Sequence, residues 1–188
     1  MKQHKFSDNI INWYYNYLMN RSSEVTIGNT TIQKSLIKGV PQGGVLSPII
    51  WNYAFDEFLN LKFDKKAKVV GFADDSVILI QGSTLNNNVK CMNKVLKKVN
   101  TWGTSVGLTF NAKKTTAVLF SKKNIKTEIP PVELGGTEIP LSDSVTYLGI
   151  ILDEQLTFRK HIENKINKAK QHLMILNSNF GSYYGPQP

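Results

Sequence analysis

Two adjacent carboxylates, Asp74 and Asp75, are the residues of this chain best suited to chemistry. Apolar stretches at 68–72 and 76–80 flank them, which predicts a β-hairpin with the carboxylates at its tip. Like charges repel, and carboxylates beside an apolar core lose solvation. A divalent cation relieves both penalties, and hard oxygen ligands suit Mg²⁺, with Mn²⁺ as the alternative ion. The pair therefore indicates a metal site for phosphoryl transfer, although a solvated Asp-Asp turn fits the same pattern.

A glycine-rich loop precedes this hairpin. Residues 38–48 feed a helix predicted to run to about Leu61, with Ser47 as its N-cap. Glycine lets the backbone approach a ligand closely, and a helix N-terminus favours phosphate. Gln42 carries both a donor and an acceptor, so it can read a sugar or base edge, or it is simply solvated. The loop lacks the Gly-Lys-Ser/Thr ending of a P-loop, which argues against a Walker-type nucleotide site.

Two lysines, Lys113 and Lys114, stand before a predicted buried strand at 115–120. A lysine at that position can neutralise or protonate a leaving pyrophosphate. An ordinary surface lysine is the alternative.

The remaining elements follow from hydrophobic periodicity and turn residues. Pro130-Pro131 is the best candidate boundary and divides residues 1–128 from residues 129–188. The other predicted elements are helices following Ser7, around 89–99 and at 158–177, hairpins turning at Gly28-Asn29 and at Gly135-Gly136, and one strand at 145–152.

Composition and charge limit the function. The chain has 188 residues, 41% of them hydrophobic and 20% charged, which is ordinary for a globular protein. Lys and Arg outnumber Asp and Glu by 23 to 14, and the formal charge of +9 favours a polyanionic partner, most simply nucleic acid. The single Cys91 excludes an intrachain disulfide framework. No apolar run approaches the ~20 residues of a membrane span, and the polar start predicts no secretory signal. We therefore expect no membrane association and an intracellular location, in nucleus or cytoplasm.

The order of four motifs is more specific than any one of them. The motifs are Gly-Val-Pro-Gln-Gly-Gly-Val-Leu-Ser-Pro at 39–48, Phe-Ala-Asp-Asp at 72–75, Gly-Leu-Thr-Phe-Asn-Ala-Lys-Lys-Thr at 107–115, and Tyr-Leu-Gly at 147–149 followed by Leu-Asp-Glu-Gln-Leu-Thr-Phe at 152–158. This order resembles consecutive motifs of reverse transcriptases, most closely those of non-LTR retrotransposons of the jockey and related types. The resemblance covers nearly the whole chain.

The resemblance implies an α+β fold. It implies a partial right-hand polymerase palm over 1–128, made of antiparallel strands backed by helices. Residues 129–188 would then form a small primer-grip hairpin and the beginning of a thumb helix. Missing palm strands should leave a sheet edge exposed.

The resemblance also implies roles for single residues in RNA-templated DNA synthesis. Asp74 would bind the catalytic metals and Asp75 would support the metal site. The partners would be an RNA template, a DNA primer and deoxynucleotides, with the oligomeric state left open. The other implied roles are nucleotide and template contact for Pro41, Gln42 and Gly43, contact near the primer end for Phe72, protonation of pyrophosphate for Lys114, and the primer grip for Tyr147, Leu148 and Gly149.

The sequence departs from this family pattern upstream of the glycine-rich loop. Reverse transcriptases need another aspartate on a palm strand there, but only Asp8 precedes the loop, in a predicted first helical turn. The fingers are also absent. We therefore expect an internal piece of a larger polyprotein or a decayed copy, without polymerase activity by itself. The alternatives are a non-catalytic nucleic-acid-binding remnant of a retroelement and an α+β fold without function, which the motif order disfavours.

Overall fold

The computed structural model describes residues 6–122 and 128–180, without the side chains of residues 179 and 180. The predictions that fall on residues 1–5, 123–127 and 181–188 lie outside this range. The chain divides into two compact units, Met1–Thr109 and Phe110–Pro188, and each is described by itself. The division at 128/129 drawn from the sequence stays a prediction. No described helix has the length and apolar character that crossing a membrane requires.

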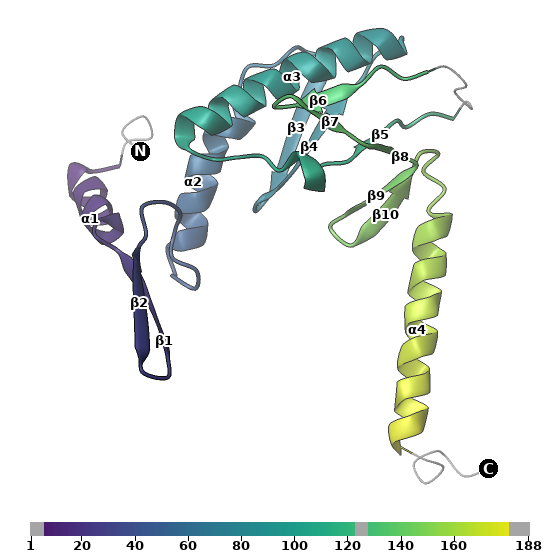
Figure 1. Cartoon of the computed structure of the whole chain (residues 1–188). Coiled ribbons are helices and arrows are strands. Elements are labelled where there is room, and N and C mark those ends of the chain that lie inside the picture. Colours follow the sequence, from purple (N-terminus) through teal and green to yellow (C-terminus); the bar gives the residue numbers. More distant parts are fainter. Residues whose placement is uncertain (1–5, 123–127, 181–188) are drawn as a thin grey trace. The chain divides into compact units, whose positions relative to one another are not determined.

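The first unit mixes helices and strands, as the sequence predicts (Figure 1). Its elements are α1 (Asp8–Leu18), β1 (Ser22–Ile27), β2 (Thr30–Ser35), α2 (Ser47–Leu59), β3 (Ala67–Phe72), β4 (Asp75–Ile80) and α3 (Leu85–Val106). The strands form two antiparallel hairpins, β1–β2 and β3–β4. Among the described residues no third strand pairs with β3 or β4, so both outer edges of this hairpin are unpaired, as expected.

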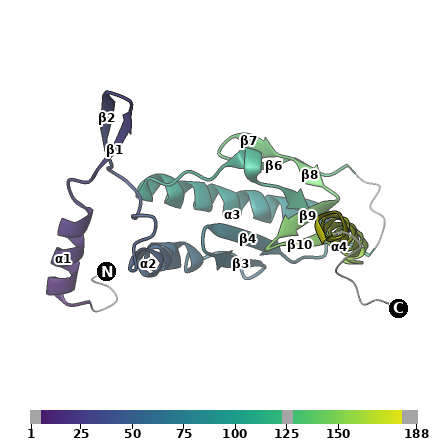
Figure 2. The same cartoon turned by 90° about the horizontal axis from the view of Figure 1, so that it is seen from below.

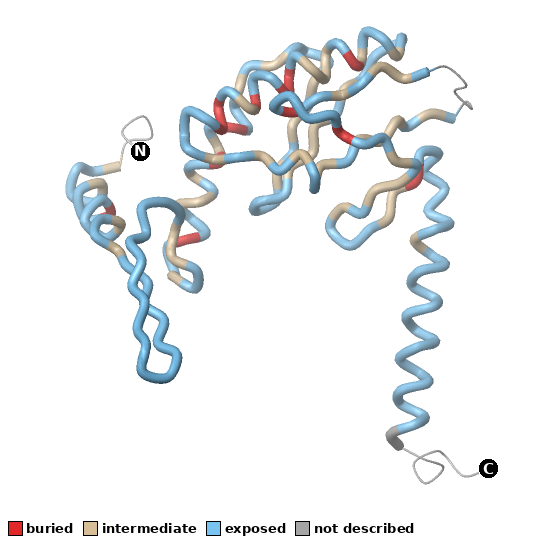
Figure 3. Tube along the Cα trace, in the orientation of Figure 1, coloured by how far each residue is buried: buried red, intermediate tan, exposed pale blue. Residues whose placement is uncertain are grey.

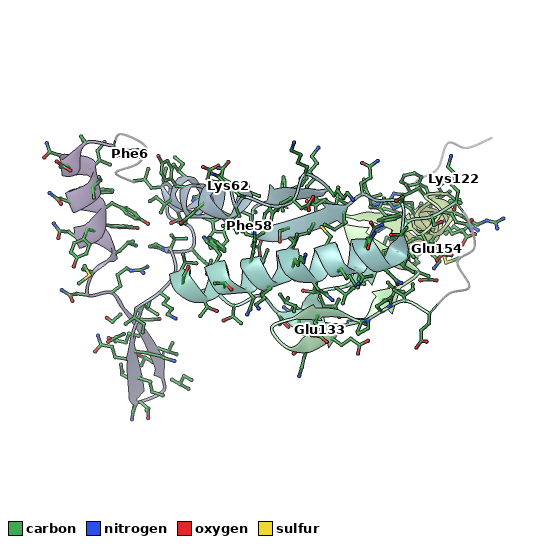
Figure 4. All side chains as sticks on the ribbon, turned by 90° about the horizontal axis from the view of Figure 1, so that it is seen from above. Phe6, Phe58, Lys62, Lys122, Glu133 and Glu154 are labelled. Atoms are coloured by element: carbon green, nitrogen blue, oxygen red, sulfur yellow. The ribbon has the colours of Figure 1, made fainter. Side chains whose placement is uncertain are left out.

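The core of the first unit lies between the β3–β4 hairpin and two helices. Helix α3 contacts both strands and α2 contacts β3, and Figure 2 shows α3 running alongside the hairpin. Phe58 of α2 is fully buried, and its ring lies 5.2 Å from that of Trp102 on α3. Figure 4 shows Phe58 on the side of α2 that faces α3, and Figure 3 shows the buried residues along these two helices. One face of the hairpin is therefore covered by helices.

The second unit is built from short strands and one long helix. Its elements are η2 (Ala112–Lys114, a 3₁₀ turn), β5 (Ala117–Val118), β6 (Val132–Leu134), β7 (Thr137–Ile139), β8 (Leu141–Ser142), β9 (Ser144–Tyr147), β10 (Ile150–Asp153) and α4 (Arg159–Phe180). Strands β6–β7 and β9–β10 are antiparallel hairpins, whereas β5 pairs with β8 in parallel. The hairpin predicted to turn at Gly135-Gly136 is confirmed.

Two strand predictions in this unit are wrong in extent. The buried strand predicted over 115–120 is reduced to β5, because only Ala117 and Val118 find a partner strand. The single strand predicted over 145–152 is a hairpin that turns at Leu148-Gly149. Both turn residues have positive φ, 48° and 78°. Glycine suits that conformation but leucine is uncommon in it, so Gly149 was the one turn signal within the apolar run.

Candidate active site

The two carboxylates lie at the tip of the β3–β4 hairpin, as predicted. Phe72 ends β3 and pairs with Asp75 at the start of β4, so Ala73 and Asp74 form a two-residue turn. Ala73 has a positive φ of 53°, and Asp74 does not. A positive φ at the first of two turn residues is the pattern of a type II′ turn, where glycine is preferred. An alanine there is held in a disfavoured backbone conformation by its surroundings.

The alternation of side chains along β3 shows on which face of the hairpin Phe72 and Asp75 lie. A Cβ atom on Gly71 would lie 2.7 Å from Cε1 of Phe55 and 3.2 Å from Cδ2 of Leu59, so Gly71 faces α2. Side chains alternate along a strand, and directly paired residues share a face. Phe72 and its partner Asp75 therefore lie on the face away from α2. The side chain of Phe72 is 62% exposed there, beside the carboxylate.

The donor set at the turn fits part of a magnesium site. Asp74 and Asp75 are both exposed, so their oxygens are accessible to an ion and its other ligands. Among the residues that the structure describes, no group of three or more His, Cys, Asp or Glu side chains is placed to hold a metal. Mg²⁺ in phosphoryl-transfer sites is commonly held by one or two carboxylates together with water and substrate phosphates. Two exposed carboxylates meet that need and leave the remaining positions to other ligands.

The glycine-rich loop is held in shape by its own polar contacts. The hydroxyl of Ser47 donates a hydrogen bond to the carbonyl oxygen of Pro41 at 2.5 Å, and the N–H of Gly44 donates to the same oxygen at 3.3 Å. Gly43 has a φ of 80°, a conformation that suits glycine. Gln42 lies exposed in this loop, with its side chain open to solvent. The arrangement leaves Gln42 accessible, and its contact with a nucleotide or template stays a prediction.

Ser47 is not the N-cap that the sequence predicts. The N-cap of α2 is Leu46, whereas Ser47 is the first helical residue and is 8% exposed. Its hydroxyl turns back to Pro41 and fastens the loop. Gly44 makes room for this contact, because a Cβ atom there would lie 2.7 Å from Oγ of Ser47.

Arg21 also holds the glycine-rich loop in place, and the sequence did not predict this role. Its guanidinium donates to the carbonyl oxygen of Gly39 at 2.7 Å and to that of Leu18 at 3.1 Å. It thereby ties the beginning of the loop to the end of α1. An arginine in a polar turn gives no sequence signal for such contacts, because both partners are backbone carbonyls and Gly39 lies 18 residues away.

One contact joins the helix that follows the loop to the carboxylate turn. The indole N–H of Trp51 on α2 donates a hydrogen bond of 2.9 Å to the carbonyl oxygen of Ala73. The indole also stacks on Phe55, with ring centroids 5.6 Å apart. The structure thus brings α2 and the turn with Asp74 together within the first unit. The sequence did not point to Trp51.

Lys114 belongs to the second unit. It is exposed at the end of η2, where the side-chain oxygen of Asn111 accepts from the N–H of Lys113 at 3.0 Å. Asp74 and Asp75 belong to the first unit. A shared role for Lys114 and the two carboxylates therefore stays a prediction.

The predicted primer-grip residues occupy the end of β9 and the turn to β10. Tyr147 is the last residue of β9 and is half-buried, whereas Leu148 is 48% exposed in the turn. Gly149 has a φ of 78°, and a Cβ atom there would meet nothing within 4 Å. The turn is thus an accessible backbone segment, and its contact with a primer stays a prediction.

Asp153 is a buried acid whose role as an anchor sequence reasoning missed. It is 8% exposed and accepts hydrogen bonds from the N–H groups of Gln155, Thr157 and Phe158 and from the hydroxyl of Thr157. These bonds, first among them the one from the N–H of Thr157, hold the pKa of Asp153 below its ordinary 3.8, against the opposing effect of desolvation. Asp153 therefore fixes the segment that leads into α4.

His161 adds a second link between α4 and β10. Its Nδ1 atom accepts a hydrogen bond of 3.2 Å from the N–H of Ile151. The accepting nitrogen is the unprotonated one, so the ring hydrogen of a neutral imidazole lies on Nε2. The start of α4 is thus held to β10 directly by His161 and indirectly by Asp153, which holds the segment before the helix.

The chain matches known proteins over most of its length. A family model described as "Reverse transcriptase (RNA-dependent DNA polymerase)" matches residues 1–152. The retrovirus-related Pol polyprotein from type-1 retrotransposable element R1 of Bradysia coprophila is 31% identical over 137 residues, 72% of this chain and 14% of that protein. No solved structure matches the chain.

Two Drosophila melanogaster proteins are also similar. The probable RNA-directed DNA polymerase from transposon BS is 27% identical over 166 residues, 85% of this chain and 18% of that protein. The RNA-directed DNA polymerase from mobile element jockey is 28% identical over 154 residues, 79% of this chain and 17% of that protein. The chain therefore spans less than a fifth of the length of these relatives.

Proposed function

Because this chain belongs to the reverse transcriptases of non-LTR retrotransposons, we propose that its first unit carries part of a polymerase active site, in which Asp74 and Asp75 bind divalent metal. The reaction is RNA-templated DNA synthesis. Its substrates are an RNA template, a DNA primer and deoxynucleotides. The ion is Mg²⁺, with Mn²⁺ as a substitute.

The observation that carries this proposal is the geometry of the carboxylate turn. Two exposed carboxylates lie at the tip of a hairpin whose other face is covered by α2 and α3. The turn is also tied to the helix that the glycine-rich loop feeds, through Trp51. Divalent ions held by Asp74 and Asp75 would supply activation of the attacking hydroxyl and stabilisation of the charge on the leaving pyrophosphate. The exposed position leaves room for the substrate oxygens.

The remaining residues have roles that follow from their chemistry and their place in the motifs. Gln42 and the backbone of Pro41 and Gly43 contact the incoming nucleotide and the template. The exposed ring of Phe72 lies beside Asp75 and packs near the primer end. In the second unit, Lys114 protonates the leaving pyrophosphate, and the turn at 147–149 grips the primer ahead of α4, the beginning of the thumb.

The two aspartates alone are not a complete catalytic set. Two-metal chemistry would need at least one further carboxylate beside Asp74 and Asp75. Asp8, the one aspartate ahead of the glycine-rich loop, lies in the first turn of α1, where an acid suits the helix N-terminus. We therefore infer that these residues act within a larger protein and that the isolated chain binds metal without polymerising.

A non-catalytic nucleic-acid binder is the second candidate function. The formal charge of +9 favours it, since charge alone supports binding to a polyanion. Such binding would weaken steeply with salt and would not depend on metal or on Asp74.

Titration of the purified chain with Mn²⁺, followed by electron paramagnetic resonance, distinguishes the two functions. The proposed site predicts binding that Mg²⁺ displaces and that Asp74→Asn weakens at least about tenfold, since a charged oxygen ligand is lost. Asp64→Asn is the matched control, because Asp64 is an exposed aspartate beyond the opposite end of the same hairpin. Equal Mn²⁺ affinity in both variants and the unmodified chain would exclude the metal site.

A further inference from the structure

The conformation of Ala73 needs support from outside the turn. Ala73 has a φ of 53°, which a residue with a Cβ atom adopts at a cost. Packing supplies little of that support, because Phe72, Ala73, Asp74 and Asp75 are all exposed. A turn of this kind, left to itself, would sample other conformations and move its carboxylates.

Trp51 supplies a fixed point for this turn. Its indole N–H donates to the carbonyl oxygen of Ala73 at 2.9 Å. That carbonyl and the N–H of Asp74 belong to one planar peptide unit. Holding the oxygen therefore fixes the orientation of the backbone from which the side chain of Asp74 extends.

The indole is itself held in place by the packing of α2 on β3. Phe55, 6% exposed, lies against Gly71, and Trp51 lies one helical turn earlier, stacked on Phe55 at 5.6 Å. Four residues of helix rise about 6 Å, and two residues of strand rise about 6.6 Å. The spacing from Phe55 to Trp51 thus matches the spacing from Gly71 to Ala73.

We propose that Trp51 is a positioning residue for the metal site: its hydrogen bond to Ala73 orients the turn and so sets the metal affinity of Asp74 and Asp75. The proposal deepens the proposed function and rests on it for its metal part. The positioning of the turn stands on the geometry alone.

Trp51→Phe is the informative variant, because it keeps a ring to stack on Phe55 and removes the N–H donor. We expect Mn²⁺ affinity to fall about fivefold, the factor that corresponds to one net hydrogen bond. We also expect ¹⁵N relaxation to show greater mobility at the amides of Asp74 and Asp75. Trp13→Phe is the matched control, since Trp13 is 53% exposed on α1 and stacks on Tyr17 at 5.6 Å.

A measurement on the unmodified chain needs no variant to fold. The indole N–H of Trp51 should exchange with solvent more slowly than that of Trp13, because the structure gives Trp51 a carbonyl acceptor. Equal exchange rates for the two indoles would overturn the proposal.

The outcomes separate the two claims. If the chain binds Mn²⁺ and Trp51→Phe binds it equally well, the positioning role is wrong and the metal site stands. If the chain binds no Mn²⁺ but Trp51→Phe loosens the turn, the metal site is refuted and the hold of Trp51 on the turn is supported. If Trp51→Phe lowers the melting temperature without altering turn mobility, Trp51 serves packing and the proposal fails.

Discussion

Gly71 and Phe55 approach so closely that no side chain fits between them. A Cβ atom on Gly71 would lie 2.7 Å from Cε1 of Phe55, a separation that real Cβ atoms essentially never show. The contact lets α2 lie directly on β3, two residues before the carboxylate turn. The position of the carboxylate turn relative to α2 therefore depends on Gly71 having no side chain.

Gly71→Ala should destabilise the first unit. Phe55 is 6% exposed and has little room to move, so the added methyl group is overpacked at a cost of about 1–3 kcal/mol. The measurement is the free energy of unfolding from urea titration. Ala54→Ser is the control, because it adds one atom at an exposed position of α2, the helix that carries Phe55. An unchanged unfolding free energy in Gly71→Ala would show that α2 does not lie on β3 as described.

Acid should loosen the attachment of α4 through Asp153. The pKa of this carboxyl is lowered in the folded chain, chiefly by the N–H of Thr157, so its contribution to stability is fully present above the ordinary value of 3.8. That contribution is lost as pH falls below 3.8 toward the lowered folded value. The readout is the helical circular dichroism signal followed from pH 6 to pH 2.

Asp153→Asn should remove that acid-dependent component and lower the melting temperature at neutral pH by a few degrees, since an amide cannot replace both carboxylate acceptors. Glu163→Gln is the control, because Glu163 makes an exposed ion pair with Arg159, a kind of pair that contributes little. Identical acid profiles for the two variants would contradict the anchoring role of Asp153.

The purified chain should give no primer extension on an RNA template with Mg²⁺ or Mn²⁺. Asp74 and Asp75 are two carboxylates, Asp8 lies in a helix, and the described residues place no third acidic side chain, His or Cys with them in a metal-holding group. Two-metal catalysis would need a further ligand there. The assay is incorporation of labelled deoxynucleotide. Extension that Asp74→Ala abolishes would prove this expectation wrong and show that the chain assembles a working site by itself.

Local signals explain which parts of the fold the sequence predicted. The hairpins at Gly28 and at Gly135-Gly136 have glycine at positions with positive φ, so composition marks their turns. The β9–β10 turn was missed because Leu148 has a positive φ, which is uncommon for leucine, so only Gly149 indicated a turn. The strand predicted over 115–120 is shorter in the structure. An apolar run does not show how many of its residues will pair with another strand, here β8.

In the candidate site, too, features set by neighbouring residues were predictable, whereas contacts with residues elsewhere in the chain were not. The place of Asp74 and Asp75 at a hairpin tip was predicted because their flanking strands are visible in the sequence, and their metal-binding role stays a prediction. Trp51 and Arg21 were missed, and Ser47 was given the wrong role, because each acts on a backbone carbonyl, and any residue can supply that acceptor. The contact of Trp51 with Ala73 spans 22 residues and becomes evident once α2 lies on β3.

The attachment of α4 has a mechanical consequence. The 22 residues of this helix span about 33 Å, and the links to β10 described above lie in its first turn and just before it. A rotation of about 10° at that joint would carry the far end by about 6 Å. A small change in the hydrogen bonds of Asp153 and His161 is therefore amplified into a large movement at the far end of α4.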